Sequence, residues 1–510
     1  MKILLANPPY RVSLNEREER FFIRAGSRWP FSVTKCKNEK SEYMPFPFYL
    51  AYTAAMLEKE KEKEEGIEVF VEDSIALNET EEKFLEKVKK INPDVVLFET
   101  STNTIRHDIG LAKKIKEFNG NAKIVMAGFH VTALARETFD ISGQAIDFLL
   151  LSEYEFNFLE LLRTLKRGGE CSGLEGIAFK KGDEIIINPV KSLLDISKLP
   201  YPARHFFPSN GNNDLSVYWD GFCQTKPAIQ MHASRGCPFR CNFCVWNQIM
   251  YRNEKYRPFP VNYICDEIES VIKEYGAREI YFDDDTFTGN KEHVLDFCRE
   301  MIKRGLHKKV FWSAMADFMI TDEEMIRTMK KSGCIGLKFG VESGNKDILN
   351  HIGKPINFNK LKINTSLCAK LRIKTHGTFT FGLSRETRKT MAETLNLAKS
   401  IDCDSVQFSI TTPFPGTRYY EELKKEGRLL SEKWEDFDGN NNCVVKFDDF
   451  NSEFIVDFYK KATGRWLRHK LKQPRWFWRQ LYYLNRSRSW QGNSFIFKRM
   501  RRALILVLSR

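Results

Sequence analysis

Three cysteines lie close together near the middle of the 510-residue chain. Cys237, Cys241 and Cys244 have the spacing C-x3-C-x2-C in the segment SRGCPFRCNFC, residues 234–244. Thiolates are soft ligands that bind zinc and iron–sulfur clusters. A structural zinc site usually has four ligands, and a ferredoxin-type cluster has a fourth cysteine. The motif therefore predicts a metal centre with one position left open for a small molecule.

Two other interpretations of these cysteines stay open at this point. The chain contains 12 cysteines, so a chance group without a role is one alternative. A zinc site completed by His232 is the other, although His232 falls inside the preceding predicted strand. Arg235 and Arg240 flank the motif, and we expect them to moderate the negative charge of a bound cluster.

The segments around the motif alternate between strand and helix patterns, which predicts a partial (β/α)6 barrel over residues 223–430. Chemistry in such barrels lies at the carboxyl ends of the strands, and the cysteine motif follows the first strand. The predicted strands are 228–234, 279–285, 310–315, 335–343, 374–382 and 405–411. The clearest predicted helices are 261–276, 292–305 and 323–333.

The first part of the chain shows a second alternation, which predicts an α/β, doubly wound, Rossmann-like domain over residues 1–165. Residues 166–222 contain a hairpin pattern and many Pro, Gly and Asn, so we interpret them as a linker. Residues 431–510 form a basic, aromatic region expected to be helical. No G-x-G-x-x-G follows the first strand, which excludes the dinucleotide fingerprint.

The barrel segment resembles the radical S-adenosylmethionine (SAM) superfamily, whose signature is C-x3-C-x2-C after the first barrel strand. The resemblance implies a 4Fe–4S cluster on the three cysteines, with SAM bound to the open iron. One electron, supplied by a donor such as flavodoxin or ferredoxin, would then cleave SAM to a 5′-deoxyadenosyl radical. In such enzymes the cofactor supplies the chemistry and the protein orients it.

The same resemblance implies contacts of further residues with SAM. Phe243 corresponds to an aromatic residue near the adenine, Asp284 and Asp285 to acids near the ammonium group, and Glu342 and Ser343 to contacts with ribose and carboxylate. The alternative for Asp284 and Asp285 is a solvated acidic turn, and the alternative for Glu342 is an acid near a helix N-terminus. The segment FTFGLSRET, residues 379–387, departs from the family pattern and leaves the role of Glu386 open.

The domain over residues 1–165 resembles the cobalamin-binding domain that precedes the barrel in one radical SAM class. The matching stretches are residues 7–10, 99–104, 127–133 and 147–155. The resemblance assigns cobalamin contacts to Ser101, Thr102, Gly128 and His130. Ile75 stands where some cobalamin proteins have a cobalt-binding histidine, so no imidazole from that loop is available.

These resemblances predict radical C-methylation of an unactivated carbon on a lipid-like or other hydrophobic small molecule. One SAM would methylate cob(I)alamin and a second would give the radical. A radical oxidative cyclase or another C–C bond-forming enzyme, of tetrapyrrole or lipid type, is the alternative. An alternative of another class is a noncatalytic metal-binding protein with a nucleic-acid-binding tail.

Charge is concentrated at the end of the chain. The net charge is +13, and residues 458–510 contain fifteen Lys and Arg but no Asp or Glu. We favour a packed helical cap or a peripheral membrane contact over nucleic acid, because segments such as RWFWRQLYYL and FKRMRRALILVLS are strongly apolar. No export signal or run of about 20 apolar residues occurs, and the scattered cysteines favour the cytoplasm. The aromatic segment 21–33 is expected as a loop at the ligand-binding end.

Overall fold

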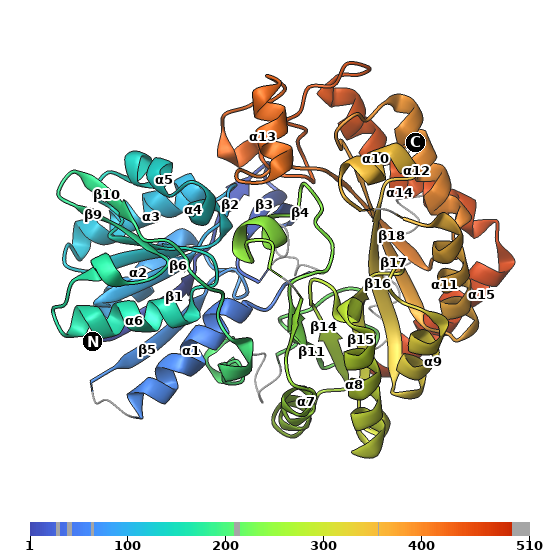
Figure 1. The fold of residues 1–510 in the computed structure, drawn as a ribbon, viewed down its shortest axis with the longest axis horizontal. Helices are drawn as coiled ribbons and strands as arrows, with labels where there is room; N and C mark the ends of the chain where they lie inside the picture. The colour runs from blue at the N-terminus through green and yellow to red at the C-terminus, as the bar shows by residue number, and fades with distance from the viewer. Residues whose placement is uncertain are drawn as a thin grey trace.

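The computed structural model describes residues 1–26, 31–37, 43–62, 66–208, 215–254, 256–354 and 356–491. Two α/β units lie side by side, and the C-terminal helices cover the outer side of the second unit (Figure 1). The predicted α/β fold class is therefore confirmed. Within the described ranges, no helix has both the length and the apolar composition needed to cross a bilayer.

The first unit contains a seven-stranded sheet in the order β10-β9-β8-β7-β6-β1-β5. Its strands are β1 (Lys2–Asn7), β5 (Glu68–Asp73), β6 (Val95–Glu99), β7 (Lys123–Ala127), β8 (Phe148–Leu150), β9 (Ile177–Lys181) and β10 (Glu184–Ile187). The helices are α1 (Phe48–Lys61), α2 (Glu81–Ile91), α3 (Ile105–Phe118), α4 (Phe129–Ala133), α5 (Ala135–Ser142) and α6 (Glu155–Lys166).

Helices cover both faces of this sheet, as its uniformly apolar strands require. In β1, Ile3 and Leu5 belong to the core cluster that contains α1 and α6, whereas Leu4 and Ala6 belong to the cluster that contains α2 and α3. Successive strand residues therefore point to opposite covered faces. The five neighbouring strands β8, β7, β6, β1 and β5 are parallel, so their carboxyl ends form one edge of the sheet.

The hairpin expected in the linker is part of this first sheet. Strand β9 pairs antiparallel with β8, and Phe148 lies opposite Phe179. The short strand β8 would otherwise leave an apolar edge unpaired, and the hairpin covers it. The first structural unit thus reaches Ile187, beyond the predicted boundary at residue 165.

The second unit is a six-stranded parallel sheet whose order follows the sequence, as expected for a partial barrel. All six strands fall on the predicted segments: β11 (Ala228–Met231), β14 (Glu279–Phe282), β15 (Phe311–Ala316), β16 (Cys334–Glu342), β17 (Lys374–Phe381) and β18 (Ser405–Ile410). The helices around them are α7 (Val261–Tyr275), α8 (Lys291–Lys303), α9 (Glu323–Lys331), α10 (Lys346–His351), α11 (Phe358–Lys370), α12 (Arg388–Ser400) and α13 (Arg418–Lys425).

Strands β17 and β18 have an apolar outer face and a polar inner face. Phe379 and Phe381 belong to the main core, and Phe381 contacts Phe458 of α14 on the outer side. The alternate residues Thr378 and Thr380 face the inside and lie opposite Gln407 and Ser409 of β18. Barrel interiors are usually filled by bulky branched side chains. Here Thr378 and Ser409 are half-buried and Gln407 is exposed, so this inner wall is accessible to a polar ligand.

The segment 21–33 is not only a loop, in contrast to the expectation. Its described residues take part in an antiparallel sheet of β2 (Arg11–Ser13), β3 (Glu18–Ile23) and β4 (Phe31–Cys36). Residues 27–30 lie outside the described part. Phe21 and Ile23 are buried in the main core, which explains the aromatic composition by packing.

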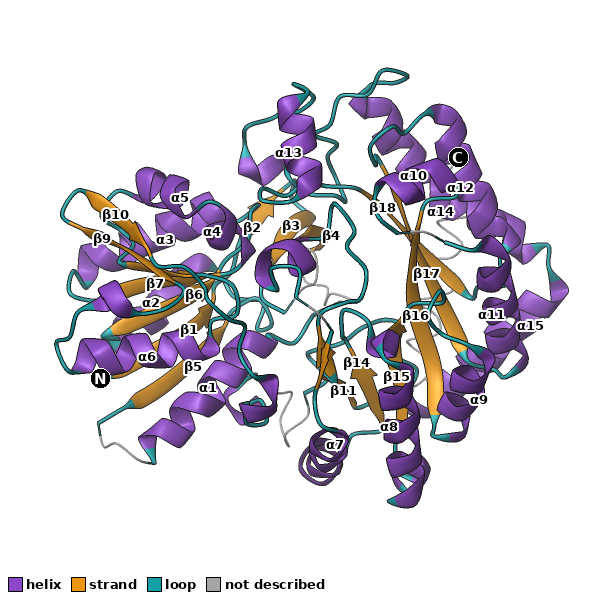
Figure 2. Cartoon of the chain, viewed as in Figure 1, coloured by secondary structure: helices purple, strands orange, loops and turns teal. Residues whose placement is uncertain are grey.

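The C-terminal region folds into α14 (Ser452–Leu471) and α15 (Pro474–Gln491), which pack on the barrel (Figure 2). The indole of Trp466 donates to the carbonyl of Ala398 at 3.0 Å, and that of Trp476 to Cys403 at 3.1 Å. These contacts support the packed-cap interpretation for the described helices. The segment FKRMRRALILVLS lies outside the described residues.

Candidate cofactor site

The cysteine motif forms a loop between the two-residue strand β12 (Ser234–Arg235) and the π-helix Trp246–Met250. Cys241 is buried, whereas Cys237 and Cys244 are partly exposed. The carboxylate of Asp284 accepts hydrogen bonds from the Ala233 amide at 2.8 Å and from the Ser234 hydroxyl at 2.5 Å. The start of the loop is therefore fixed by an acid from the end of the neighbouring strand β14.

The donor set of this loop fits an iron–sulfur cluster. The pKa of the Cys241 thiol is raised mainly by burial and also by Cys244, while the nearby Lys354 ammonium lowers it. Cys237 accepts a hydrogen bond from the Thr286 hydroxyl at 3.1 Å. No three Cys, His, Asp or Glu side chains of the described residues are arranged around a single metal ion. A four-iron cluster does not require that arrangement, because each thiolate binds a different iron.

Lys354 is a buried cation beside this loop that the sequence analysis missed. Its ammonium lies 2.8 Å from Glu342 and 3.9 Å from Asp317. Burial alone would lower the pKa of Lys354, but these two carboxylates raise it above its usual range. A Cβ on Gly340 would lie 2.6 Å from the ammonium nitrogen, so a larger residue there would require the Lys354–Glu342 pair to shift. No sequence motif marked Lys354, which reaches the site through a loop after α10.

The predicted SAM residues take different positions around the loop. Asp285 accepts from the Gly236 amide at 3.0 Å, and Glu342 has a backbone φ of +67° while pairing with Lys354. Ser343 is fully buried, and its hydroxyl lies 3.3 Å from that of Thr394 in α12. Phe243 is buried in the main core. The structure therefore brings Asp285 and Glu342 to the loop but directs the Ser343 hydroxyl toward α12.

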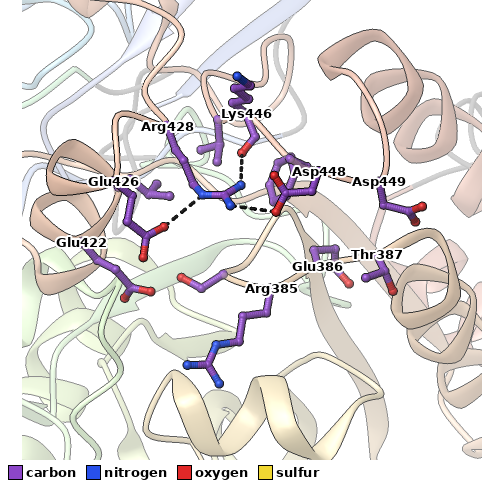
Figure 3. A pocket seen from close by; sticks show the side chains of 13 residues that line it. Arg385, Glu386, Thr387, Glu422, Glu426, Arg428, Lys446, Asp448 and Asp449 are labelled. Carbon is purple, nitrogen blue, oxygen red and sulfur yellow. Dashed lines mark hydrogen bonds and ion pairs between the residues drawn. The ribbon is translucent and has the colours of Figure 1, made fainter.

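Glu386 lies in the turn after β17 and lines a cavity beside the barrel. This cavity has about 800 Å³ of empty volume (Figure 3). The carboxylate of Glu386 accepts hydrogen bonds from the Gly382 amide at 3.2 Å and the Thr390 hydroxyl at 2.5 Å. Arg428 in the same cavity pairs with Glu426 at 3.0 Å and Asp448 at 2.7 Å. Because Glu386 and Arg428 each have partners within the protein, we assign no cofactor contact to this cavity.

The predicted cobalamin residues meet at the carboxyl ends of β6 and β7. The ring nitrogen Nδ1 of His130 lies 3.2 Å from the Thr102 hydroxyl, and Ser101 bonds to Asn103 at 2.8 Å. Gly128 has a φ of +121°, and a Cβ there would lie 2.3 Å from the Thr100 carbonyl oxygen. Only glycine therefore allows this close approach between the two strand ends.

Two buried polar atoms at this edge support a ligand there. Among the described residues, neither Nε2 of His130 nor Nδ2 of Asn103 has a hydrogen-bond partner. Burial lowers the pKa of His130 to about 3, so its ring is neutral and one nitrogen donates. Unpaired buried donors are costly, and the amide-fringed corrin or its phosphate tail would satisfy them. The edge therefore fits cobalamin, and Ile75 is buried after β5 with no histidine in its place.

Trp434 covers this edge from the C-terminal region, which sequence reasoning did not foresee. Its ring meets that of His130 edge to face at 5.3 Å, and its indole donates to Glu137 at 2.8 Å. The contact joins residues about 300 positions apart, so no local pattern could reveal it. Residues 431–510 thus contact both units.

Arg235 joins the cysteine loop to the cobalamin-type domain. It is fully buried and pairs with Glu153 at 2.9 Å and Glu155 at 2.5 Å, both just beyond β8. Its guanidinium also lies 4.4 Å from the ring centre of Tyr49 in α1. The expectation that Arg235 moderates the charge of the cluster is wrong, because two carboxylates of the other unit already compensate it. Arg240 is exposed at the tip of the loop.

A smaller cavity of about 340 Å³ lies between the two units. Its walls combine one face of α1, the end of β11, the π-helix and the acidic turn after β14, namely Gly26, Phe48, Tyr49, His232, Ser234, Trp246, Tyr251, Asp283 and Asp285. His232 stacks on Phe48 with ring centres 3.7 Å apart. His232 therefore faces α1, which removes the support for a zinc site completed by this residue.

Comparisons with known proteins agree with this geometry. The radical SAM superfamily model matches residues 231–398, and the B12 binding domain model matches residues 37–159. An uncharacterized methyltransferase of Pyrococcus horikoshii is 30% identical over 417 residues, which are 82% of this chain and 86% of that protein. The anaerobic magnesium-protoporphyrin IX monomethyl ester cyclase of Cereibacter sphaeroides is 27% identical over 68% of this chain and 55% of its own length.

A solved structure has the same fold over most of the chain. The cobalamin-dependent SAM radical enzyme OxsB, with aqua-cobalamin and SAM bound, superposes with a TM-score of 0.65 at 13% identity. The match covers 96% of this chain and 83% of OxsB. The chain therefore belongs to the radical SAM superfamily. More narrowly, it is a cobalamin-dependent radical SAM enzyme, whose cofactors are a 4Fe–4S cluster, SAM and cobalamin.

The buried carboxyl group of Glu99, at the end of β6, should make the free energy of unfolding of the protein depend on pH. Burial raises its pKa to about 7, although the Tyr154 hydroxyl donates to it at 2.7 Å. Because the folded state holds this proton more tightly than the unfolded state, stability is greatest at low pH and falls as the pH rises toward 7. We expect Glu99→Gln to remove about 3 kcal/mol of this loss, measured by urea unfolding between about pH 4.5 and pH 8. Glu117→Gln on the exposed side of α3 should leave the pH profile unchanged; an equal effect would contradict the assignment.

The link through Arg235 predicts that Arg235→Met destabilises the protein by about 3–5 kcal/mol, because the buried Glu155 loses its cation while Glu153 keeps Arg257 at 2.9 Å. The loss should be smaller at about pH 5 than at about pH 8, because burial raises the pKa of Glu155 and its protonation removes the unpaired charge. Urea midpoints at both pH values measure this difference. Arg240→Met, four residues from Cys244 on the exposed tip, is the matched control and should retain the wild-type midpoint. A pH-independent loss would show that Arg235 acts only by packing.

Proposed function

We propose that the protein catalyses radical C-methylation of an unactivated carbon. The observation that carries this proposal is the small cavity between the two units, whose lining joins Ser234 and Asp285 beside the cysteine loop to Phe48 and Tyr49 of the cobalamin-type domain. When bound, the cluster with SAM supplies a carbon-centred radical and cobalamin supplies the methyl group. The identity with a methyltransferase over 86% of that protein supports the same reaction.

The division of labour between the units follows from this proposal. We assign cobalamin to residues 1–165 together with the hairpin β9–β10, and the cluster and SAM to residues 223–430. Ser101, Thr102, Gly128 and His130 would contact cobalamin. Their neutral hydroxyl, backbone and imidazole groups suit a ligand whose rim carries amides.

Around SAM, the chain's own charges suggest distinct roles. The carboxylate of Asp285 lines the cavity and would accept from the ammonium group, whereas Asp284 holds the loop through its two hydrogen bonds. Glu342 would face the nucleoside with its orientation set by Lys354 at 2.8 Å. We assign Phe243 to packing beneath the adenine and Ser343 to the support of this strand end.

The substrate class is inferred from the wall of the barrel. Thr378 and Ser409 line an accessible inner face of the barrel, and four aromatic side chains line the cavity next to the cobalamin-type domain. An amphipathic small molecule, with a polar part in the barrel and an apolar part against the aromatic rings, would satisfy both surfaces. This refines the expected lipid-like intermediate to one that carries hydrogen-bonding groups.

Oxidative cyclisation is the second candidate, favoured by the 27% identity with a radical cyclase. The two reactions differ in what the product gains. Methylation adds a carbon that comes from SAM, whereas cyclisation adds none and removes hydrogen from the substrate. Isotopic labelling of the SAM methyl group therefore separates them.

Two partners accompany the proposed reaction. A one-electron donor of flavodoxin or ferredoxin type would reduce the cluster, because SAM cleavage consumes an electron. We also propose a peripheral contact of the C-terminal region with a membrane, in line with its basic and aromatic composition.

The cysteine assignment is tested by anaerobic reconstitution of the full chain. We expect about four irons per chain, one bound cobalamin and conversion of SAM to 5′-deoxyadenosine on reduction. Cys241→Ala should abolish that conversion but retain cobalamin, because the two sites lie in different units. Cys36→Ala, an exposed thiol of β4, is the control and should behave as wild type. When the reconstituted protein and methyl-labelled SAM are added to an extract of cells that lack the protein, the new product should carry the label. An unlabelled, oxidised product would favour the cyclase.

Lys354 should raise the reduction potential of the cluster, because its buried ammonium acts electrostatically on Cys241. Lys354→Met removes a positive charge and should shift the midpoint potential of the cluster to more negative values by tens of millivolts, since ~59 mV corresponds to about 1.4 kcal/mol for one electron. Lys354→Arg retains the charge and should restore the potential. A spectroscopic redox titration measures both variants. An unchanged potential in Lys354→Met, with normal iron content, would refute this role.

A further inference from the structure

We infer that the exposed side of α15 is a docking surface for an anionic membrane. This α15 face consists of Phe477, Trp478, Leu481 and Tyr482, whose exposed fractions are 43%, 68%, 40% and 37%. Monomeric proteins rarely group large apolar side chains in this way unless the patch binds something. The inference specifies the surface for the peripheral contact proposed above and does not depend on the reaction.

The orientation of α15 is fixed by its opposite side. Trp476 and Tyr483 are buried, and the guanidinium of Arg479 pairs with Asp402 at 2.7 Å and with Asp404 at 2.5 Å. The four side chains of the α15 face stand at i, i+1, i+4 and i+5, which places them together on the outward side. The helix therefore cannot bury this face against the barrel without breaking those contacts.

The composition of the α15 face matches the interfacial region of a bilayer. Trp and Tyr concentrate where lipid headgroups meet the hydrocarbon, because one end of each ring system is apolar and the other polar. A helix that lies in this plane inserts its apolar side chains and keeps its polar side in water or against protein. Here the protein side is already occupied by the barrel.

Charge selects an anionic surface. The exposed Lys472 and Arg475 border the α15 face, and Arg372 lies 4.7 Å from the ring centre of Tyr482. No Asp or Glu occurs between residues 458 and 510. Anionic lipids attract such a segment by about 1 kcal/mol per basic residue near the surface. Two copies of the same basic surface would repel each other, which disfavours self-association through this face.

Nucleic acid would require a different distribution of charge. Backbone binding depends on many Lys or Arg contacts to phosphates along the bound strand. In the described residues, the centre of the α15 face carries apolar side chains, and its exposed cations gather near the start of the helix. A lipid surface accepts this arrangement, because apolar insertion and charge act together.

The location of α15 separates docking from catalysis. Arg479 reaches Asp404, which directly precedes β18, and Arg486 lies 4.3 Å from the ring centre of Phe311, the first residue of β15. The α15 face therefore belongs to the amino-terminal rim of the barrel, whereas the cysteine loop lies at the carboxyl-terminal rim. A bilayer at α15 would anchor the enzyme without covering the cavity between the units.

Vesicle flotation with the full-length reconstituted protein tests the inference. We expect binding to vesicles that contain phosphatidylglycerol, weaker binding to pure phosphatidylcholine vesicles, and loss of binding at high salt. The double variant Trp478→Ser/Leu481→Ser should lower the partition coefficient at least tenfold, and Lys472→Glu/Arg475→Glu should abolish the preference for anionic lipid. Ile363→Ser, which changes an equally exposed residue of α11, is the matched control and should bind as wild type.

Other outcomes of the same experiment would overturn the inference. These are absence of vesicle binding, equal binding by the Trp478→Ser/Leu481→Ser variant, or displacement of the protein from vesicles by duplex DNA at equal phosphate concentration. Cys241→Ala separates this inference from the proposed reaction: it should float as wild type while forming no 5′-deoxyadenosine. The Trp478→Ser/Leu481→Ser variant should show the reverse behaviour, with normal SAM cleavage and a partition coefficient lowered at least tenfold.

Discussion

The buried Arg235 connects the chemistry of one unit to the fold of the other. Charge in a low-dielectric interior is tolerated only when it is paired and hydrogen bonded. Arg235 meets Glu153 and Glu155 from the far unit, while the preceding residue, Ser234, is held by Asp284 of its own barrel. The position of the cysteine loop thus depends on the correct placement of the cobalamin-type domain. Assembly of the two units is a condition for forming the cluster site.

Local patterns identified most of the architecture. The six barrel strands and the cysteine spacing could be predicted because each is specified by neighbouring residues: short apolar runs give strands, and three thiols within one loop give a ligand set. Asp284 shows the limit of this approach. Its position after β14 indicated a polar residue near the loop, but the direction of its side chain depends on the amide and hydroxyl groups of Ala233 and Ser234, which only the tertiary fold supplies.

Contacts between distant segments could not be predicted. Lys354 has no motif of its own, and its role arises from its pairing with Glu342 at 2.8 Å, a contact that the fold creates. Trp434 reaches His130 across some 300 residues, and the hairpin β9–β10 joins the first sheet because β8 has an edge to pair. In each case the sequence contained the residues but no spacing that related them. Arg235 was misassigned for the same reason, since its two acidic partners lie about 80 residues away.

The C-terminal region packs against two different parts of the molecule, which its composition alone could not indicate. Near its start, Trp434 closes the cobalamin edge by contact with His130 and Glu137. Further along, α14 and α15 cover the outer side and the amino-terminal rim of the barrel, and Arg479 neutralises Asp402 and Asp404. A region that spans both units in this way restrains their relative motion. The α15 face lies on the rim opposite the cavity, so a contact made there would leave this restraint intact.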